Sequence, residues 1–265
     1  MDTTLMWKTP RQRASADLAL SQDTIHVWCA PLLARPAVRA LLPLLSADER
    51  QRSERFRFER DRQRFVATRG RLRMLLGAYL GQEPAAIELD YGAHGKPLLG
   101  GALRHHPLRF NTSHSREMAL FAVAVGREVG VDVEWVRADI PVADLAERFL
   151  SPAEATAIHA APESNRLSAF FGCWTRKESF LKARGDGLSL GLDRFDVLDS
   201  TDGSVALRTP WDPTEADRWT VRDLWPGQGY AGAVAAAGRC WRLRCWQWPE
   251  QVVDLTGTLS VTPGL

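Results

Sequence analysis

Apolar residues recur with helical spacing in two long stretches of the chain, and each stretch follows a helix-start signal. The signals are "LSADE" at 45–49 and "LSPAE" at 150–154, both of the Ser-x-x-Glu form in which the side chains cap the first turn. The first predicts a long helix that ends near Gly81. The second predicts a short helix, a polar break at "APESN" and a long helix over 166–184, which the glycines of "RGDG" end.

Runs of alternating or β-branched residues follow each long helix and predict strands. Before position 126 these are AIELDY, LRFNTS and MALFAVAV; after it they are VGVDVEWV, RFDVLD, VALRT, WTVRDLW, YAGAVAAA and RLRCWQW. The order predicts an α+β fold of two similar subdomains with pseudo-twofold symmetry, each a small, mainly antiparallel sheet packed with a long helix. We place the halves at 1–126 and 127–265, with a ligand cleft between them.

The strand VGVDVEWV carries two acidic residues in a setting suited to burial. Asp132 and Glu134 are two positions apart, so they share one face of the strand, while the valines share the other. Adjacent carboxylates repel and raise each other's pKa unless a cation lies between them. The alternatives are therefore a solvent-exposed face with two ordinary acids, or half of a site for a hard divalent cation such as Mg²⁺.

The helix in "FFGCWTRKESFLKARGDGLSL" offers further charged groups. Trp174, Glu178 and Lys182 form one i,i+4 row, whereas Lys177 falls on one side with Leu181. Glu178 and Lys182 could form an ordinary surface ion pair. The second possibility is a carboxylate flanked by two ammonium groups, which suits a site that holds a metal and phosphates together.

Two short motifs in the first half place polar residues at turns and strand ends. "HGKPLL" is a turn into a strand, with Lys96 between Gly95 and Pro97. "RFNTSHS" ends in hydroxyl residues around His114, which could be a phosphate donor or a structural histidine. Ser113 next to His114 does not form a hydrolase motif, because no G-x-S-x-G elbow is present.

Composition excludes several classes of protein. The 265-residue chain has 45% hydrophobic residues and a net charge of +2, which predicts a globular protein that is not built to coat nucleic acid. No apolar run approaches a membrane span, and the first residues lack a signal-peptide pattern. The cysteines match no zinc spacing and predict small buried residues in a reducing compartment. We therefore expect a cytoplasmic monomer with no membrane partner.

Arginines are concentrated in residues 50–73. Many of them belong to a solvated helix face with i,i+4 ion pairs. Because so many cations converge there, an anion site that uses two or three of them is also expected.

The motifs together identify a family. "FNTSHS", "GVDVEW" and "WTRKESFLKARGDGLSL" occur in the order and spacing of the 4′-phosphopantetheinyl transferases of the long, single-chain Sfp type, and "HGKPLL" resembles the turn that precedes them. The similarity runs over about 45–190. It implies a pseudo-twofold α+β fold, Mg²⁺ or Mn²⁺ as the metal, coenzyme A as the donor and an acyl or peptidyl carrier protein as the acceptor.

The resemblance also implies a role for each matched residue. Metal ligands would be Asp132, Glu134 and Glu178, with Glu178 and Lys182 catalytic. Lys177 and Lys182 would face the phosphates, and Ser113 and His114 would contact the phosphate end of coenzyme A. The adenine side would be lined by Gly95, Lys96 and Pro97, and the nucleotide would be gripped by Arg52 and Arg64.

The expected reaction is transfer of 4′-phosphopantetheine to a carrier serine with release of 3′,5′-ADP. Glu178 would take the serine proton and Lys182 would stabilise the leaving group. Two rival hypotheses are a Mg²⁺-dependent nuclease or phosphodiesterase and a non-catalytic module that binds nucleic acid through the arginine-rich helix. The pair at Asp132 and Glu134 weighs against the module, because carboxylates repel phosphate when no metal is bound.

Overall fold

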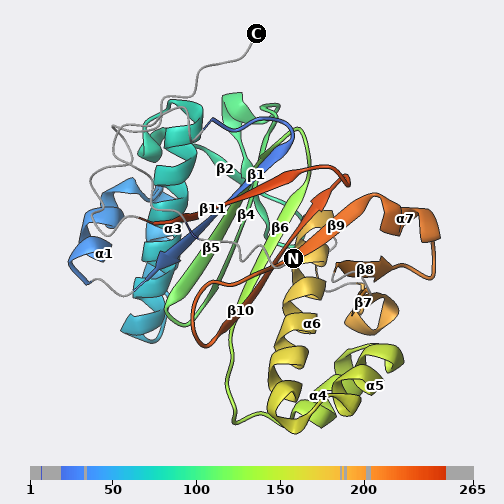
Figure 1. Ribbon diagram of the computed structural model, residues 1–265. Helices are drawn as coiled ribbons and strands as arrows, with labels where there is room; N and C mark the ends of the chain where they lie inside the picture. Colours follow the sequence, from blue (N-terminus) through green and yellow to red (C-terminus); the bar gives the residue numbers. More distant parts are fainter. Residues whose placement is uncertain are drawn as a thin grey trace.

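Two long helices enclose a pair of packed sheets, as the ribbon diagram shows (Figure 1). The structure is a computed structural model that describes residues 7, 19–32, 35–185, 187, 190–200 and 204–248. Its core lies in three layers of buried side chains, between each helix and its sheet and between the two sheets. This arrangement gives an α+β fold, as the sequence predicted.

The first half runs from strand β1 to strand β5. Its elements are β1 (Thr24–Pro31), α1 (Arg35–Leu41), α2 (Ala47–Glu54), α3 (Glu59–Leu80), β2 (Leu89–Tyr91), β3 (Pro97–Leu99), β4 (Leu108–Ser115) and β5 (Met118–Val125). Helix α3, which is buried all round from Val66 to Tyr79, packs on one face of β1, β4 and β5, where its apolar side chains join the cluster around Trp28 and Phe121.

The second half repeats this plan with one added strand. Its elements are β6 (Val129–Trp135), α4 (Val142–Phe149), α5 (Pro152–Ala160), α6 (Glu163–Arg184), β7 (Asp196–Asp199), β8 (Val205–Arg208), α7 (Pro213–Asp217), β9 (Trp219–Leu224), β10 (Tyr230–Ala237) and β11 (Arg242–Gln247). Helix α6 packs on β6, β9 and β10 as α3 packs on its own sheet.

The strand orders show the pseudo-twofold relation. The first sheet has the order β11-β1-β5-β4 and the second has the order β6-β10-β9. In each half the first strand (β1 or β6) pairs with the last (β5 or β10), which also pairs with the strand before it (β4 or β9). The short strands β2 and β3, and likewise β7 and β8, form matching hairpins. All these pairings are antiparallel except that of β11 with β1. The sheet of the first half thus includes a strand from beyond position 126.

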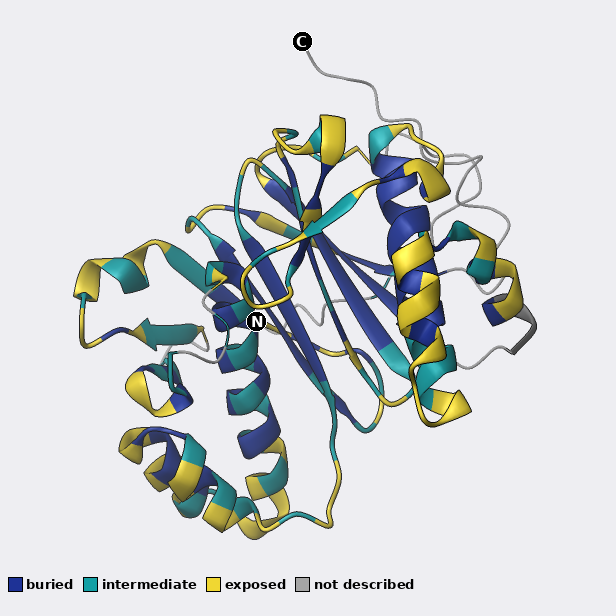
Figure 2. Cartoon of the chain, turned by 180° about the vertical axis from the view of Figure 1, so that it is seen from behind, coloured by how far each residue is buried: buried dark blue, intermediate teal, exposed yellow. Residues whose placement is uncertain are grey.

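The inner faces of the two sheets pack against each other through small and β-branched residues. Alternate residues of β1, β5, β6 and β10 meet there with little exposed surface, as the dark blue strands of Figure 2 show. Exposed residues gather instead at hairpins and on the outer faces of the helices. Among the described residues, no helix is both long and apolar enough to cross a membrane.

Most predicted elements are present, with two differences in the helices. Both Ser-x-x-Glu signals form capping boxes, and the long helices end at Gly81 and Gly185 in the left-handed conformation. However, the first helical pattern is broken at 55–58 into α2 and α3, and α6 begins at Glu163. Strand β1 was not predicted. Of the cysteines, Cys240 is exposed and the other described ones are buried free thiols.

Candidate active site

Strand β6 presents its polar residues to α6 and its valines to the space between the sheets. Val129, Val131 and Val133 are fully buried in the cluster between the sheets. Because side chains alternate along a strand, Asp132 and Glu134 lie on the opposite face, where α6 packs. The strand is therefore a buried platform for the two carboxylates.

Gly130 allows α6 to approach β6 closely enough to complete the site. A Cβ at this position would overlap the backbone oxygen of Ser179 and the backbone nitrogen of Ala183. The contact is with helix backbone, which cannot move aside as a side chain can. The close approach brings Lys182 and Glu178, on the same face of α6, to the carboxylates of β6.

Asp132 is the buried centre of the site. Only 2% of its surface is exposed. Its Oδ1 accepts hydrogen bonds from Lys182 Nζ at 2.5 Å and from Ser113 Oγ at 2.8 Å. Its Oδ2 is buried without a hydrogen-bond partner, so one carboxylate oxygen remains available to a ligand.

The charge of Asp132 affects the pKa of the two neighbouring carboxylates, Glu134 and Glu178. Burial, followed by the charge of Asp132, raises the pKa of Glu178, and Lys182 opposes this only in part. The pKa of Glu134 is raised by burial and then by Asp132, against a hydrogen bond from Ser115. Mutual repulsion of this kind is relieved when a cation binds between the acids.

These residues fit a hard divalent cation, although they do not form a finished site. Among the described residues, no group of three or more His, Cys, Asp or Glu side chains already converges as metal ligands. The donor set is nevertheless all carboxylate oxygen, which Mg²⁺ and Mn²⁺ prefer. The free Oδ2 of Asp132 and the raised pKa of Glu134 and Glu178 show an excess of negative charge that such an ion would neutralise.

Strand β4 of the first half fixes the carboxylate strand through a row of polar residues. Asn111 Oδ1 accepts from Val131 N at 2.9 Å, and Ser115 Oγ donates to Glu134 Oε2 at 2.8 Å. Ser113 makes the third link, to Asp132. The predicted contact residue Ser113 is therefore in the site, and Asn111 and Ser115 are additional members. Their alternation in "FNTSHS" was the signal that could have found them.

His114 points to the other face of β4 and is exposed. Its pKa is lowered by partial burial, then by Lys182 and Arg64. A neutral imidazole close to these cations can donate a hydrogen bond to an anion, so the predicted contact with phosphate remains a proposal.

The turn around Lys96 reaches the end of α6 from the first half. Gly95 has φ +75°, and Lys96 Nζ donates to the backbone oxygen of Lys182 at 2.8 Å and to that of Val129 at 3.3 Å. Burial lowers the pKa of Lys96, although Glu128 acts in the opposite direction. Together with the buried Pro97, this turn borders the C-terminal end of the α6 row.

The prediction for Lys177 needs correction. Its side chain is fully buried, 2.7 Å from a carboxylate oxygen of Glu154. It donates to the backbone oxygens of Leu192, at 2.6 Å, and Phe195. These contacts turn Lys177 toward the protein interior, away from Asp132, so it does not face a phosphate. Its role here is to hold α5 and the segment before β7 against α6.

The two predicted nucleotide-binding arginines differ in position. Arg64 pairs with Glu117 at 2.6 Å and with Asp61 at 3.2 Å, and it lies near enough to His114 to lower its pKa. Arg52 is exposed on α2, with its guanidinium 5.3 Å from the ring centre of Phe65. Its described contacts do not connect it with the carboxylates.

An aromatic cavity adjoins the carboxylates at the N-terminal side of the α6 row. Its volume is about 380 Å³. It is lined by Ser115, Arg116, Glu134, Trp135, Arg137, Ile140, Leu145, Phe170, Phe171 and Trp174. A cavity with apolar walls and a carboxylate at its edge can hold an uncharged chain whose end must reach the acids.

The chain belongs to the 4′-phosphopantetheinyl transferase superfamily, a class of enzymes. Residues 128–235 match that superfamily, and residues 34–126 match the N-terminal region of 4′-phosphopantetheinyl transferases.

Among its relatives is the 4′-phosphopantetheinyl transferase HetI of Nostoc sp. strain PCC 7120, 37% identical over 88% of this chain and 95% of its own length. Sfp of Bacillus subtilis strain 168 is 28% identical over 64% of this chain and 73% of its own. A solved holo-(acyl-carrier-protein) synthase of Bacillus anthracis, in complex with CoA (3′,5′-ADP), is 18% identical over 42% of this chain and 94% of its own, with a TM-score of 0.36.

Proposed function

We propose that the protein transfers 4′-phosphopantetheine from coenzyme A to a serine hydroxyl of an acyl or peptidyl carrier protein, with Mg²⁺ or Mn²⁺ bound by Asp132, Glu134 and Glu178. The observation that carries the proposal is the buried Asp132. It has one oxygen held by Ser113 and Lys182 and the other without a partner, beside two carboxylates of raised pKa. The names of the relatives support the same reaction.

The α6 row from Trp174 to Lys182 has two distinct ends, which suit the two parts of coenzyme A. Lys96 contacts the backbone of Lys182 at one end of the α6 row, and Trp174 lines the aromatic cavity at the other. The row from Trp174 to Lys182 spans about 12 Å along the helix axis. We assign the nucleotide to the Lys96 end, the diphosphate to the centre and the pantetheine arm to the aromatic cavity.

The bound metal would offset the charge of the diphosphate and of the oxygens that change bonding during transfer. Ser113 and Ser115 hold two of the proposed ligands, Asp132 and Glu134, in place from strand β4. Such supporting hydrogen bonds fix ligand orientation before the metal arrives.

Glu178 is the proposed base, and Lys182 is proposed to stabilise the leaving group. Glu178 lies one helical turn before Lys182 on the same face of α6, a position from which its carboxylate can act as a general base toward an acceptor hydroxyl. It accepts the proton of the carrier serine while the serine oxygen forms a bond to the phosphorus that bears pantetheine. The bond from that phosphorus to the bridging oxygen breaks, and the Lys182 ammonium stabilises the negative charge on the departing 3′,5′-ADP.

Mass spectrometry of an apo carrier protein tests this function directly. Incubation with coenzyme A, Mg²⁺ and the enzyme should transfer one phosphopantetheine group, which increases the mass of the carrier by about 340 Da. Asp132→Asn should abolish the gain, and Arg242→Glu, a change on the exposed far edge of the first sheet, is the matched control. No gain with carriers of fatty-acid, polyketide and peptide synthesis would refute the proposal.

A further inference from the structure

Arg116 occupies a backbone position that normally selects glycine. It lies in the tight turn between β4 and β5 with φ +48°, and it is the one non-glycine residue of positive φ in the described part of the chain. Its neighbour Ser115 holds Glu134. An arginine retained in an unfavourable conformation next to a candidate active site suggests that its side chain has a function there.

The Arg116 guanidinium lies where two cavities meet. It is 5.3 Å from the ring centre of Trp135, and both residues line the aromatic cavity. They also line a second cavity of about 390 Å³, together with Arg60, Arg64, Glu117 and Tyr230. Because Arg116 is exposed, it lies at the entrance of the aromatic cavity, which Glu134 also lines.

Two cations at this entrance have no acidic partner within ion-pair distance among the described residues. Arg116 and Arg137 are exposed, and neither forms an ion pair with any residue that the structure describes. Arg64, which lines the neighbouring cavity, is by contrast paired with Asp61 and Glu117. Arg137 lies near enough to Glu134 to act against the rise of its pKa. The entrance thus presents two guanidinium groups beside an apolar cavity.

We infer that Arg116 and Arg137 bind an acidic side chain located close to the acceptor serine of the carrier protein. The inference rests on the proposed function and extends it to acceptor choice. A guanidinium that is already stacked on an aromatic ring is orientated for a carboxylate at little further entropic cost. The turn with Lys96 borders the other end of the α6 row, so we place the carrier at the end with Arg116.

The phosphates of coenzyme A are the other anions that could reach this region, and kinetics separate the two sources. Arg116→Glu and Arg137→Glu should each lower kcat/KM for an acidic carrier about tenfold, as expected for close interfacial charge pairs. The KM for coenzyme A should change much less, because the aromatic cavity is assigned to the uncharged pantetheine arm, which cannot pair with a guanidinium. A rise in that KM with no change for the carrier would assign the guanidinium groups to a phosphate and overturn the inference.

The unusual backbone at position 116 provides a sharper control. Arg116→Gly relieves the positive φ and removes only the side chain, so the protein should fold at least as well and still lose affinity for the carrier. Arg116→Lys keeps the charge and should lose less. Arg242→Glu, an exposed charge change on β11, should leave kcat/KM for the carrier unchanged. Full activity of Arg116→Gly would refute the inference.

Exchange of charge identifies the partner group. The probe is an apo carrier protein with aspartates or glutamates within two helical turns of its acceptor serine, each changed to lysine in turn. For one of these lysine variants of the carrier, kcat/KM with the Arg116→Glu enzyme should be about tenfold higher than with the wild-type enzyme. If no exchanged pair recovers, the proposed contact does not exist.

Calorimetric binding of the carrier without coenzyme A separates this inference from the proposed function. Binding that weakens in Arg116→Glu while the wild-type enzyme transfers no phosphopantetheine would refute the transferase function and keep the binding surface. Transfer by the wild-type enzyme together with equal carrier affinity in Arg116→Glu would support the transferase function and refute the binding surface.

Discussion

The two halves of the molecule share a buried ion pair that fixes the long helix to the helix before it. In the first half, Glu49 of the α2 capping box lies 2.6 Å from Arg73 of α3. In the second half, Glu154 of the α5 capping box lies 2.7 Å from Lys177 of α6. Each cation also donates to backbone oxygens of the segment after its helix. The repeat thus has one construction in both halves.

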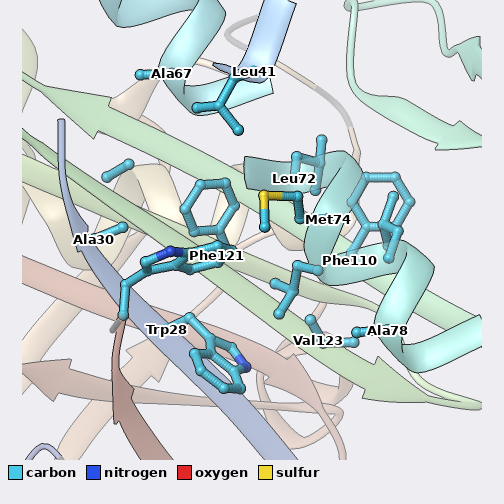
Figure 3. Close-up of a cluster of buried hydrophobic side chains, with 14 of the residues drawn as sticks. Trp28, Ala30, Leu41, Ala67, Leu72, Met74, Ala78, Phe110, Phe121 and Val123 are labelled. Carbon is cyan, nitrogen blue, oxygen red and sulfur yellow. The ribbon is translucent and has the colours of Figure 1, made fainter. Parts of the chain in front are cut away.

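The halves differ in the residues that come after this common cation along the helix. Directly after Arg73, α3 carries Met74 and, one turn later, Ala78; α6 carries Glu178 and Lys182 at the matching places. Met74 and Ala78 are buried in the apolar cluster of the first half, as Figure 3 shows. The same surface of the helix therefore carries packing residues in one half and the proposed catalytic residues in the other.

The strands beneath the helices differ in the same way. Trp28 of β1 lies where β6 has Asp132, as judged by the residues that each strand turns toward the inner cluster. Trp28 is fully buried and stacks on Trp246 at 5.9 Å. One half gains stability from this interface, and the other carries mutually repelling carboxylates there, which we propose bind a metal ion. Such a division is typical of functional sites.

The largest contrast is expected between Glu178→Gln and Met74→Gln. Loss of the proposed base should lower kcat/KM about a thousandfold or more. It should not lower stability, because the raised pKa of Glu178 shows that its charged form is disfavoured in the fold. Met74→Gln should do the opposite, with a loss of about 2 kcal/mol from burial of an amide and normal activity of the folded fraction.

Carrier modification and urea unfolding, measured on both variants, check this contrast. Normal turnover in Glu178→Gln, or its marked destabilisation, would show that the residue has a structural role instead.

The buried ion pairs should respond alike in stability and differently in activity. Glu49→Gln and Glu154→Gln each leave a buried cation without its charge partner, which costs about 3–5 kcal/mol. Only Glu154→Gln should also lower kcat per folded molecule, because α6 carries Glu178 and Lys182. Urea unfolding gives the first quantity and activity under fully folding conditions gives the second. Equal activity in the two variants would mean that α6 is held by its apolar contacts alone.

The helix–strand spacing should matter more for metal binding in the second half than in the first. Gly130→Ala places a methyl group against the backbone of α6, whereas Gly70→Ala in α3 meets the side chain of Leu41. We expect about 1–3 kcal/mol of destabilisation for Gly130→Ala. We also expect weaker Mg²⁺ binding, so that transfer requires a higher Mg²⁺ concentration. Gly70→Ala should destabilise by a comparable amount, because the Cβ of Leu41 is fixed to the backbone of α1, but it should leave the Mg²⁺ dependence unchanged. Titration of activity with Mg²⁺ distinguishes the variants.

Acidification should change the stability contributions of the titrating groups in the two halves in opposite directions. Burial lowers the pKa of His26 on β1 to about 3, so its neutral form is favoured in the fold. Its contribution is complete above pH 6.5 and is lost as the pH falls, at about 1.4 kcal/mol per pH unit. Glu134 and Glu178 have a raised pKa, so their protonation on acidification favours the fold.

Stability curves of His26→Gln and Glu178→Gln between pH 4 and pH 7 test the signs. Relative to the wild type, the first variant should lose less stability in acid and the second should lose more. An unchanged slope in His26→Gln would mean that the histidine stays neutral in the unfolded chain as well or charges without cost in the fold.

Much of this organisation could be predicted from local sequence signals. The capping boxes, the glycine ends of α3 and α6 and the alternation around Asp132 and Glu134 depend on near neighbours, so they were predicted correctly. The helical row of Glu178 and Lys182 was also visible. These signals were enough to predict the fold and the acidic centre of the candidate site.

Features that depend on distant packing could not be predicted in the same way. Lys177 belongs to a charged motif, but its place on the side of Leu181 indicated the interior, and only the buried Glu154 makes that position tolerable. Strand β1 takes its partners from β5 and β11, so its sequence alone gave a weak signal. The unpaired state of Arg116 depends on which acids the fold brings near.

The parallel pairing of β1 with β11 has a consequence for synthesis on the ribosome. Residues 24–31 leave the exit tunnel long before their outer partner, residues 242–247. Until that partner emerges, β1 presents an unpaired edge that could recruit a strand from another nascent chain. Slow translation or a truncated message should therefore favour aggregation, and chaperone demand should be set by the timing of one late strand.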